Sequence, residues 1–398
     1  MRILGIIVLL LVTVTVRAAQ RLVVTNHTDR QRHEVIAVDG RAIADSALVI
    51  RDAFGIACPW QRTYDGELLL YVSVRPFGQA VYTIEQGTQE PMRRYVAGRC
   101  YPERADDIAF ENDRAGFRIY GPGTQQRGEQ SFGIDLWVKH SSELMVDSLY
   151  RLEFSRHAEI AAWRQRGNQQ AADSLTTMTS YHLDHGAGMD AYGVGPTLGC
   201  GTPALMVGDS ICYPWCYEQY QILDDGPLRF TLQLDFPTVT IAGMQVTEHR
   251  VMTLDRGTNF CRMTVWYDGL TRPVCLAAGV AIRCADTRAV VLGDDYLHYA
   301  DPTVDAWRHN SQIYVGLVFP EKVDVICMKP FPQPVGINYG HGLGIIAGYT
   351  GYRYSYAIGM AWSDFDVRSQ QEWQLRLEQY RADRQTPLTY RLESGKRG

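Results

Sequence analysis

Apolar and polar residues alternate along much of the chain. Over residues 228–236, LRFTLQLDF, the apolar side chains fall on one face and the polar side chains on the other. This period of two is typical of a half-buried antiparallel strand. The same pattern, with Gly- or Asp-containing turns between the segments, predicts strands at residues 67–74, 117–120, 133–139, 245–254, 260–267, 312–319, 323–328 and 355–362.

Two stretches depart from this alternation. Residues 142–172 favour helix, with small and apolar residues close together around position 160. Near the C-terminus, Ser369 and Glu372 form a capping box, which predicts a helix carrying Trp373 and Leu377 at helical spacing. We therefore expect a mainly β protein: a large antiparallel β-sandwich formed by residues 19–398 as a single domain, with a helical insertion and a C-terminal helix.

Composition is that of a globular protein. Hydrophobic residues make up 46% of the chain and charged residues 21%, and 39 Lys+Arg against 44 Asp+Glu give a formal charge of −5. These values exclude a disordered chain or a fibre. No basic stripe is present, so we expect no nucleic-acid partner. Aromatic residues reach 11% and favour a sugar ligand only weakly.

The N-terminus predicts export. Arg2 precedes an apolar run from Ile3 to Val16, and Ala18 and Ala19 follow. Because a membrane-spanning helix needs roughly 20 apolar residues, we expect residues 1–18 to be a signal peptide, with a retained anchor as the alternative. The mature protein would then be periplasmic or secreted, without stable membrane insertion. Among the 9 cysteines, Cys212 and Cys216 could close a small disulfide loop, and buried free thiols are the alternative.

An acidic stretch at residues 102–122, PERADDIAFENDRAGFRIYGP, is the first candidate for chemistry. Phe110 and Phe117 bracket its charges, which suggests burial, and buried carboxylates must be paired or bound to a cation. Asp106, Asp107, Asn112 and Asp113 offer the hard oxygen ligands that calcium prefers, although the EF-hand spacing is absent. A salt-bridged surface loop is the alternative.

A glycine-rich segment at residues 181–201, YHLDHGAGMDAYGVGPTLGCG, is the second candidate. It holds side chains suited to proton transfer near neutral pH, namely His182, Asp184, His185, Asp190 and Tyr192. Two histidines and a carboxylate could also hold a divalent ion, although this spacing is not a specific metal motif. The alternative is a glycine-rich loop whose histidines bond only to backbone.

Further candidates lie on predicted strands. Asp135 and Trp137 share one face of GIDLWVK, where a carboxylate would stand beside a sugar-stacking ring, and Arg229 could clamp a carboxylate. Tyr339, His341 and Trp362 are weaker candidates, better explained singly as core residues.

Together with DDGPLRFTLQL and the AIGMAWS…QEW ending, these motifs resemble a family of secreted bacterial proteins catalogued as domain-of-unknown-function family 4861, over nearly the whole mature chain. Members typically accompany enzymes that degrade pectin and other uronate polysaccharides, so the resemblance implies a glycan context. By analogy it implies a galactose-mutarotase-like supersandwich. One departure is Ala187, where relatives commonly carry Glu. The family pattern falls on Glu103, Arg104, Asp107, Glu111, Asn112, Asp113, Asp135, Trp137, His182, Asp184, His185, Asp190, Tyr192, Gly226, Arg229 and Trp362.

We therefore expect an oligosaccharide or polysaccharide as partner and an enzyme acting on acidic, uronate-containing oligosaccharides. As a lyase, Arg104 or Arg229, or a cation such as calcium, would neutralise the uronate, His182 or His185 would be the base and Tyr192 the acid. As a hydrolase, Glu111 with Asp184 or Asp190 would flank the scissile bond. The alternatives are a non-catalytic glycan-binding or sugar-epimerising module, with Trp137 and Tyr192 as its platform, and a structural surface protein. The enzyme hypothesis requires the acidic stretch and the histidine segment to meet around one hollow.

Overall fold

The alternation over residues 228–236 produces strand β15 (Arg229–Asp235) in the computed structural model of the protein. Phe230, Leu232 and Leu234 of β15 are fully buried, whereas Arg229 and Gln233 are only partly covered. The structure describes residues 19–43, 47–88, 91–283, 287–302 and 310–394. The predicted signal peptide and Cys284 lie outside this part.

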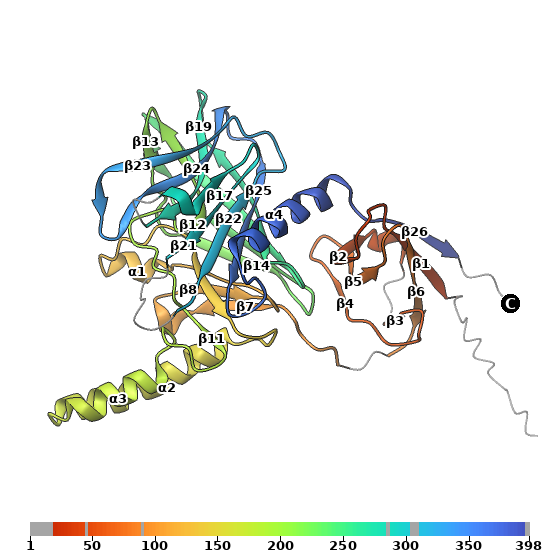
Figure 1. Ribbon diagram of the computed structural model, residues 1–398, viewed down its shortest axis with the longest axis horizontal. Helices are drawn as coiled ribbons and strands as arrows, with labels where there is room; N and C mark the ends of the chain where they lie inside the picture. Colours follow the sequence, from red (N-terminus) through yellow and green to blue (C-terminus); the bar gives the residue numbers. More distant parts are fainter. Residues whose placement is uncertain (1–18, 44–46, 89–90, 284–286, 303–309, 395–398) are drawn as a thin grey trace, which may run out of the picture.

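The first strands and the last one form a small unit with its own core (Figure 1). One sheet has the order β26-β1-β6-β3, and the other has the order β2-β5-β4. Leu22, Ile50, Leu70 and Val72 are among the residues that form its core. The strands are β1 (Gln20–Thr25), β2 (Arg32–Val38), β3 (Leu48–Arg51), β4 (Trp60–Arg62), β5 (Leu68–Val74), β6 (Gln79–Gln86) and β26 (Thr389–Ser394).

A larger unit contains three sheets that share one core. The largest sheet runs β14-β15-β17-β18-β25-β22-β21-β20, with β16 paired to β17. Its strands are β14 (Gln219–Asp225), β15, β16 (Val239–Ile241), β17 (Met244–Asp255), β18 (Phe260–Asp268), β20 (Val290–Leu292), β21 (Tyr296–Asp301), β22 (Ile313–Val318) and β25 (Tyr354–Trp362).

The two other sheets of this unit have five strands each. One has the order β13-β12-β19-β24-β23, with β12 (Cys200–Val207), β13 (Ser210–Cys212), β19 (Val274–Ile282), β23 (Val325–Val335) and β24 (Asn338–Tyr349). The other has the order β11-β10-β9-β8-β7, with β7 (Ala97–Tyr101), β8 (Asp107–Glu111), β9 (Gly116–Ile119), β10 (Asp135–Lys139) and β11 (Gly188–Met189). The pairings between these strands are antiparallel.

The helical insertion is present between β10 and β11 as α2 (Val146–Gln165) and α3 (Gln169–Thr179), which project from the sheets in Figure 1. Leu149 and Tyr150, in the first turns of α2, are buried. A short helix, α1 (Pro122–Gln126), follows β9. No helix of the described chain is long and apolar enough to cross a membrane.

The C-terminal helix α4 (Gln370–Gln385) begins where the capping box predicts. The Glu372 N–H donates to the Ser369 hydroxyl at 3.2 Å, and the Glu372 carboxylate accepts from the Arg368 N–H at 2.8 Å. Trp373 and Leu377 are buried in a cluster with residues of β18, β22 and β25. The mainly β class, the antiparallel sheets, the helical insertion and this helix are confirmed. After α4 the chain returns to the small unit as β26, so α4 connects the two units (Figure 1).

Candidate functional site

Arg118, on β9, is the point at which the acidic stretch and the histidine segment meet. Its guanidinium donates to Asp135 of β10, with Nε 3.0 Å from Oδ2, and to Asp190, at 2.6 Å. The Asp107 carboxylate, on β8, lies 4.0 Å from Arg118. Antiparallel pairing of β8, β9 and β10 sets these side chains next to one another, because neighbouring residues on adjacent strands share a face.

The charges of this cluster are nearly excluded from water. Arg118 is 2% exposed, Asp190 3%, and Asp107 and Asp135 0%. Burial raises the pKa of Asp107 to about 6, although Arg118 and Arg104 act in the opposite direction. Burial likewise raises the pKa of Asp190 to about 6, opposed by Arg118. The two segments therefore meet in a packed polar cluster and not in the expected hollow, and only its rim can reach a ligand.

The edge of the cluster, which we call the rim, consists of Arg104 and His182 at the surface and Tyr181 beneath them. The Arg104 side chain is 20% exposed, whereas Tyr181 is 3% exposed. The Arg104 Nε donates to the Tyr181 hydroxyl at 3.1 Å, and one Arg104 terminal nitrogen lies 3.7 Å from Asp107. The rings of Tyr181 and His182 are in contact, with centroids 4.3 Å apart. His182 Nδ1 lies 3.4 Å from Asp190 Oδ2 and 3.2 Å from the Asp190 carbonyl oxygen. The His182 side chain is 48% exposed, and its hydrogen bonds within the described residues use Nδ1 and the backbone N–H and leave Nε2 unengaged.

The loop that carries these residues is held by short-range bonds. The Asp184 carboxylate accepts from the Gly186 and Gly188 N–H groups and pairs with His140. Gly188 has φ 126°, and a Cβ there would overlap the Val138 carbonyl oxygen and lie 2.7 Å from Met145 Sδ. Only glycine fits this close approach to β10. His185 Nε2 lies 3.1 Å from the Ser180 carbonyl oxygen, which is the backbone-bonding role that the alternative interpretation of this segment assigned to it.

Two predicted catalytic residues lie away from the rim. Glu111 is buried, pairs with Lys139 and accepts from the N–H groups of Met145 and Val146 at the start of α2, so it stabilises the insertion. Tyr192 is buried in the main core, with the Arg283 guanidinium 4.4 Å from its ring centroid. Burial raises the pKa of Tyr192 far above its ordinary value. Neither residue faces a ligand.

The four predicted cation ligands do not gather around a common point. Asp107 begins β8 and accepts from the Gly121 N–H, whereas Asn112 and Asp113 follow its other end. The Asn112 amide donates to the carbonyl oxygens of Asp255 and Thr258, and Asp113 accepts from the Gly257 N–H. The Asp106 carbonyl oxygen accepts from the Tyr217 hydroxyl. Among the described residues, no three His, Cys, Asp or Glu side chains converge as metal ligands. The calcium interpretation of this stretch thus has no counterpart in the geometry.

The predicted substrate-binding residues are dispersed. Trp137 is fully buried against Tyr150 and Tyr181, at centroid distances of 5.1 and 5.2 Å, so it supports the rim and cannot stack on a sugar. Glu103 pairs with Arg99 at the surface. Arg229 makes a bidentate pair with Asp255, at 2.6 and 2.9 Å, far along the chain from the cluster.

Two of the residues named as core candidates, Trp362 and His341, are buried in the core, although the His341 Nδ1 has no hydrogen-bond partner within the described residues. Trp362 is buried, donates to the Asn310 carbonyl oxygen at 2.8 Å and contacts the His140 ring. His341 is buried and accepts from the Leu198 N–H, and burial lowers its pKa to about 3. Cys212 and Cys216 are free thiols, so the small disulfide loop is absent.

Comparison with known proteins identifies the family. A family model described as "Domain of unknown function (DUF4861)" matches residues 24–389. The chain belongs to this family. The uncharacterized protein P7 of Formosa agariphila is 28% identical to it over 193 residues, which are 47% of this chain and 44% of P7. The chain thus matches less than half the length of this curated relative.

Solved structures resemble the DUF4861 chain only distantly. An α-mannosidase from Enterococcus faecalis V583 has a TM-score of 0.49 at 10% identity and covers 96% of this chain and 46% of its own. A protein of glycosyl hydrolase family 38 from Enterococcus faecalis has a TM-score of 0.46 at 9% identity, covering 96% of this chain and 48% of its own.

Two residues of this candidate site, Arg118 and Tyr181, were not among the predicted site residues. Arg118 was visible only as one of several arginines in the acidic stretch, and Tyr181 only as the first residue of the glycine-rich segment. A signal for Arg118 did exist, because an arginine between apolar residues of a strand needs a buried acid as partner. No local signal marks Tyr181, whose role depends on Arg104 from a distant segment.

Proposed function

We propose that this protein is a carbohydrate-active enzyme that cleaves uronate-containing oligosaccharides by β-elimination. The observation that carries the proposal is the rim: a half-exposed His182 held by buried Asp190, beside an arginine bonded to a tyrosine. A lyase needs a cation for the uronate carboxylate, a base for its α-proton and an acid for the leaving oxygen. The rim contains a candidate for each role: Arg104 as the cation, His182 as the base and Tyr181 as the acid. Tyr181 contacts both of the other two.

His182 is the proposed base. Asp190, which contacts Nδ1, favours the tautomer in which Nε2 is unprotonated and faces the ligand. The buried carboxylate also stabilises the imidazolium that forms when Nε2 takes a proton. His185 is the weaker candidate because its Nε2 is engaged by the Ser180 carbonyl oxygen.

Arg104 and Tyr181 complete the proposed chemistry. Arg104 would pair with the uronate carboxylate, which makes the neighbouring C–H more acidic. His182 would take that proton, the electron pair would form the C=C bond, and the bond from carbon to the bridging oxygen would break. The Tyr181 hydroxyl would protonate the leaving oxygen. Because Tyr181 is 3% exposed, this step requires the hydroxyl to become accessible when Arg104, which now bonds to it, turns to the uronate. Burial raises the pKa of Tyr181, which keeps it in the protonated form that this step needs. Tyr181 thereby replaces Tyr192 as the proposed acid.

The geometry favours elimination over hydrolysis. A glycoside hydrolase needs two carboxylates on opposite sides of the scissile bond, ~5–9 Å apart. Glu111 and Asp190 are both 3% exposed and are engaged by Lys139 and Arg118. The binding-module alternative is also less favoured, because Trp137 and Tyr192 are buried and offer no aromatic platform.

The N-terminal sequence supports an exported protein. An apolar run after Arg2, followed by small residues, fits cleavage near residue 18 and action in the periplasm or outside the cell.

The test is incubation of the purified protein with galacturonate and other uronate oligosaccharides. The proposal predicts ultraviolet absorbance from an unsaturated uronate product. New reducing ends without that absorbance would indicate hydrolysis and contradict the elimination mechanism. If none of the uronate oligosaccharides is cleaved, the proposal that the protein is an enzyme acting on them is wrong.

A histidine series tests the assignment of the base. His182→Ala should lower turnover by about 10²–10⁴-fold, the usual contribution of a general base. His157→Ala is the matched control, because His157 is an exposed histidine on α2 that contacts Glu153 and Phe154 of the same helix and lies outside the rim. Equal activity of both variants would contradict the role of His182, provided that both keep the wild-type melting temperature.

A further inference from the structure

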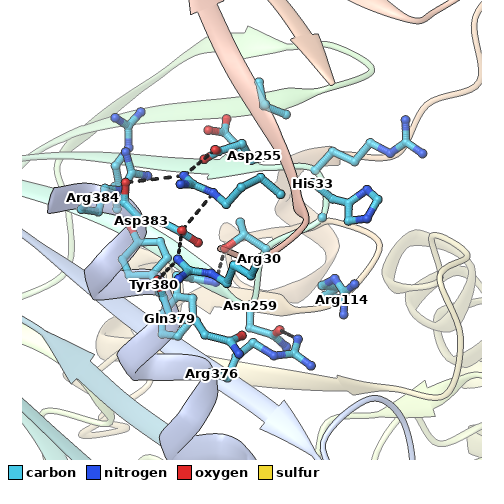
Figure 2. Close-up of a pocket in the computed structure, with 18 of the residues that line it drawn as sticks. Arg30, His33, Arg114, Asp255, Asn259, Arg376, Gln379, Tyr380, Asp383 and Arg384 are labelled. Atoms are coloured by element: carbon cyan, nitrogen blue, oxygen red, sulfur yellow. Dashed lines mark hydrogen bonds and ion pairs between the residues drawn. The ribbon is translucent and has the colours of Figure 1, made fainter. Parts of the chain in front are cut away.

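A cavity of about 300 Å³ lies between the small N-terminal unit, the β17–β18 turn and α4 (Figure 2). Arginine dominates its wall, with seven arginines and only three acidic residues among the lining side chains, although the whole chain has a formal charge of −5. The arginines come from four separate parts of the chain: Arg30, Arg32, Arg114, Arg256, Arg262, Arg376 and Arg384. We call this cavity the arginine pocket.

The carboxylates near the arginine pocket are shared. Asp383 of α4 pairs with both Arg30 and Arg32. Asp366 accepts from Arg114 at 2.6 Å and from Arg376 at 3.3 Å. Arg32 also pairs with Glu34 at 2.6 Å, so two carboxylates face the two arginines on that side of the cavity. One carboxylate cannot neutralise two guanidinium groups, so positive charge remains on the side of Arg114 and Arg376.

Arg262, on β18, is the least compensated of these side chains. The nearby Asp255 carboxylate is already taken by the bidentate pair with Arg229. Within the ranges that the structure describes, no hydrogen bond or ion pair reaches the Arg262 guanidinium. Burial lowers the pKa of Arg262, as do its neighbours Arg229 and Arg384, while Asp255 acts in the opposite direction. Keeping Arg262 charged in this position is therefore unfavourable in free energy, and an anion bound in the cavity would reduce that penalty.

We propose that the arginine pocket binds a ligand carrying two or more oxyanion groups. The planar guanidinium fork matches carboxylate, sulfate and phosphate oxygens in the same bidentate way. Arg262 would hold one group, and Arg114 with Arg376 would hold a second across the cavity. Such a ligand is either a charged saccharide or a free polyvalent ion.

The arginine pocket is separate from the proposed lyase site. Arg114 follows the end of β8 opposite to the one that carries Asp107. At ~3.3 Å per residue, β8 places more than ~13 Å between them. The proposal therefore does not rest on the elimination chemistry, and His182→Ala should leave binding in the arginine pocket unchanged.

The test is isothermal titration of the full chain at constant ionic strength with inorganic sulfate, pyrophosphate, trigalacturonate and a neutral trisaccharide. We expect pyrophosphate or trigalacturonate, which carry two or more oxyanion groups, to bind with one-to-one stoichiometry and more tightly than sulfate, which carries one, and the neutral sugar not to bind. Sulfate binding as tightly as the other two anions would overturn the two-group arrangement. Binding of trigalacturonate alone would identify a saccharide ligand, and binding of the inorganic ions alone would identify a free ion. Absence of binding by all three anions would overturn the proposal.

Arg262→Gln ties the binding to this cavity. Loss of a charge-assisted hydrogen bond should raise Kd by about tenfold or more. The variant should remain folded, because within the described ranges the Arg262 guanidinium makes no hydrogen bond or ion pair that the substitution would break. Arg41→Gln is the matched control, since Arg41 is 91% exposed and pairs only with Asp39. Equal Kd values for Arg262→Gln and the wild type would overturn the assignment.

Discussion

Replacing Arg118 by Met tests the polar cluster that joins the two segments. The Arg118 side chain is 3% exposed and is the shared partner of Asp135 and Asp190. Methionine is similar in length and apolar, so it fills the space but leaves both carboxylates buried without a cation. Removing one partner of a buried ion pair costs about 3–5 kcal/mol. We expect the free energy of unfolding to fall by that amount at pH 7.

The pH dependence of this loss separates charge from packing. Without the guanidinium, the pKa of the Asp190 carboxyl rises above its wild-type value of about 6. The variant therefore takes up this proton at a higher pH than the wild type, and the loss should shrink as the pH falls toward about 6. The measurement is urea unfolding of the wild type and Arg118→Met at pH 5 and pH 7. Arg156→Met is the control, because the exposed Arg156–Glu159 pair on α2 should contribute less than about 1 kcal/mol.

A loss below about 1 kcal/mol at pH 7, or one that does not vary with pH, would refute the reasoning. If Arg118→Met does not fold, Arg118→Lys provides the same test, since it retains the charge but loses the bidentate geometry. A Lys variant as stable as the wild type would likewise refute the importance of the shared guanidinium.

Three further predictions follow from other parts of the fold. Asp107 has a folded-state pKa of about 6, above the unfolded value of ~3.9, so its folded form retains a proton longer. The wild-type free energy of unfolding, relative to Asp107→Asn, should therefore fall as the pH rises from about 4 to about 6, and a constant difference in urea unfolding would contradict this. Gly188→Ala should lower the free energy of unfolding by about 1–3 kcal/mol, because a Cβ would overlap the Val138 carbonyl oxygen. Gly128 also has a positive φ, but no atom lies within 4 Å of a Cβ added there, so Gly128→Ala should lower the free energy of unfolding by less in the same urea titration. Ser369→Ala should lower the free energy of unfolding by about 1 kcal/mol, because it removes the cap of α4. Ser155→Ala, on the exposed face of α2, is the control and should leave the melting temperature unchanged.

The sequence predicted those elements whose formation depends on neighbouring residues in the chain. Alternation located β15, and the capping box located the start of α4 to the residue. The glycine-rich strand β24 was missed because its pattern of small residues has no clear alternation. The small N-terminal unit was missed as well, because its separate core depends on β26 returning from the far end of the chain.

The site was predictable only in part. Spacing brought His182 and Asp190 to attention, and the structure pairs them. Spacing could not show that Tyr192, two residues beyond Asp190, enters the core, or that Glu111 is taken by Lys139 and the start of α2. These outcomes depend on which face of a loop or strand the fold covers. The arginine pocket is a stronger case, because Arg30, Arg262 and Arg384 meet only through the docking of two units.

The most direct test of the proposed function is a crystal structure of His182→Ala with a bound uronate oligosaccharide. The proposed elimination mechanism predicts a uronate carboxylate paired with Arg104, with its α-carbon facing the space that the imidazole occupied and the bridging oxygen near the Tyr181 hydroxyl. A sugar bound elsewhere, with Arg104 still bonded to Tyr181 and no uronate at the rim, would contradict it.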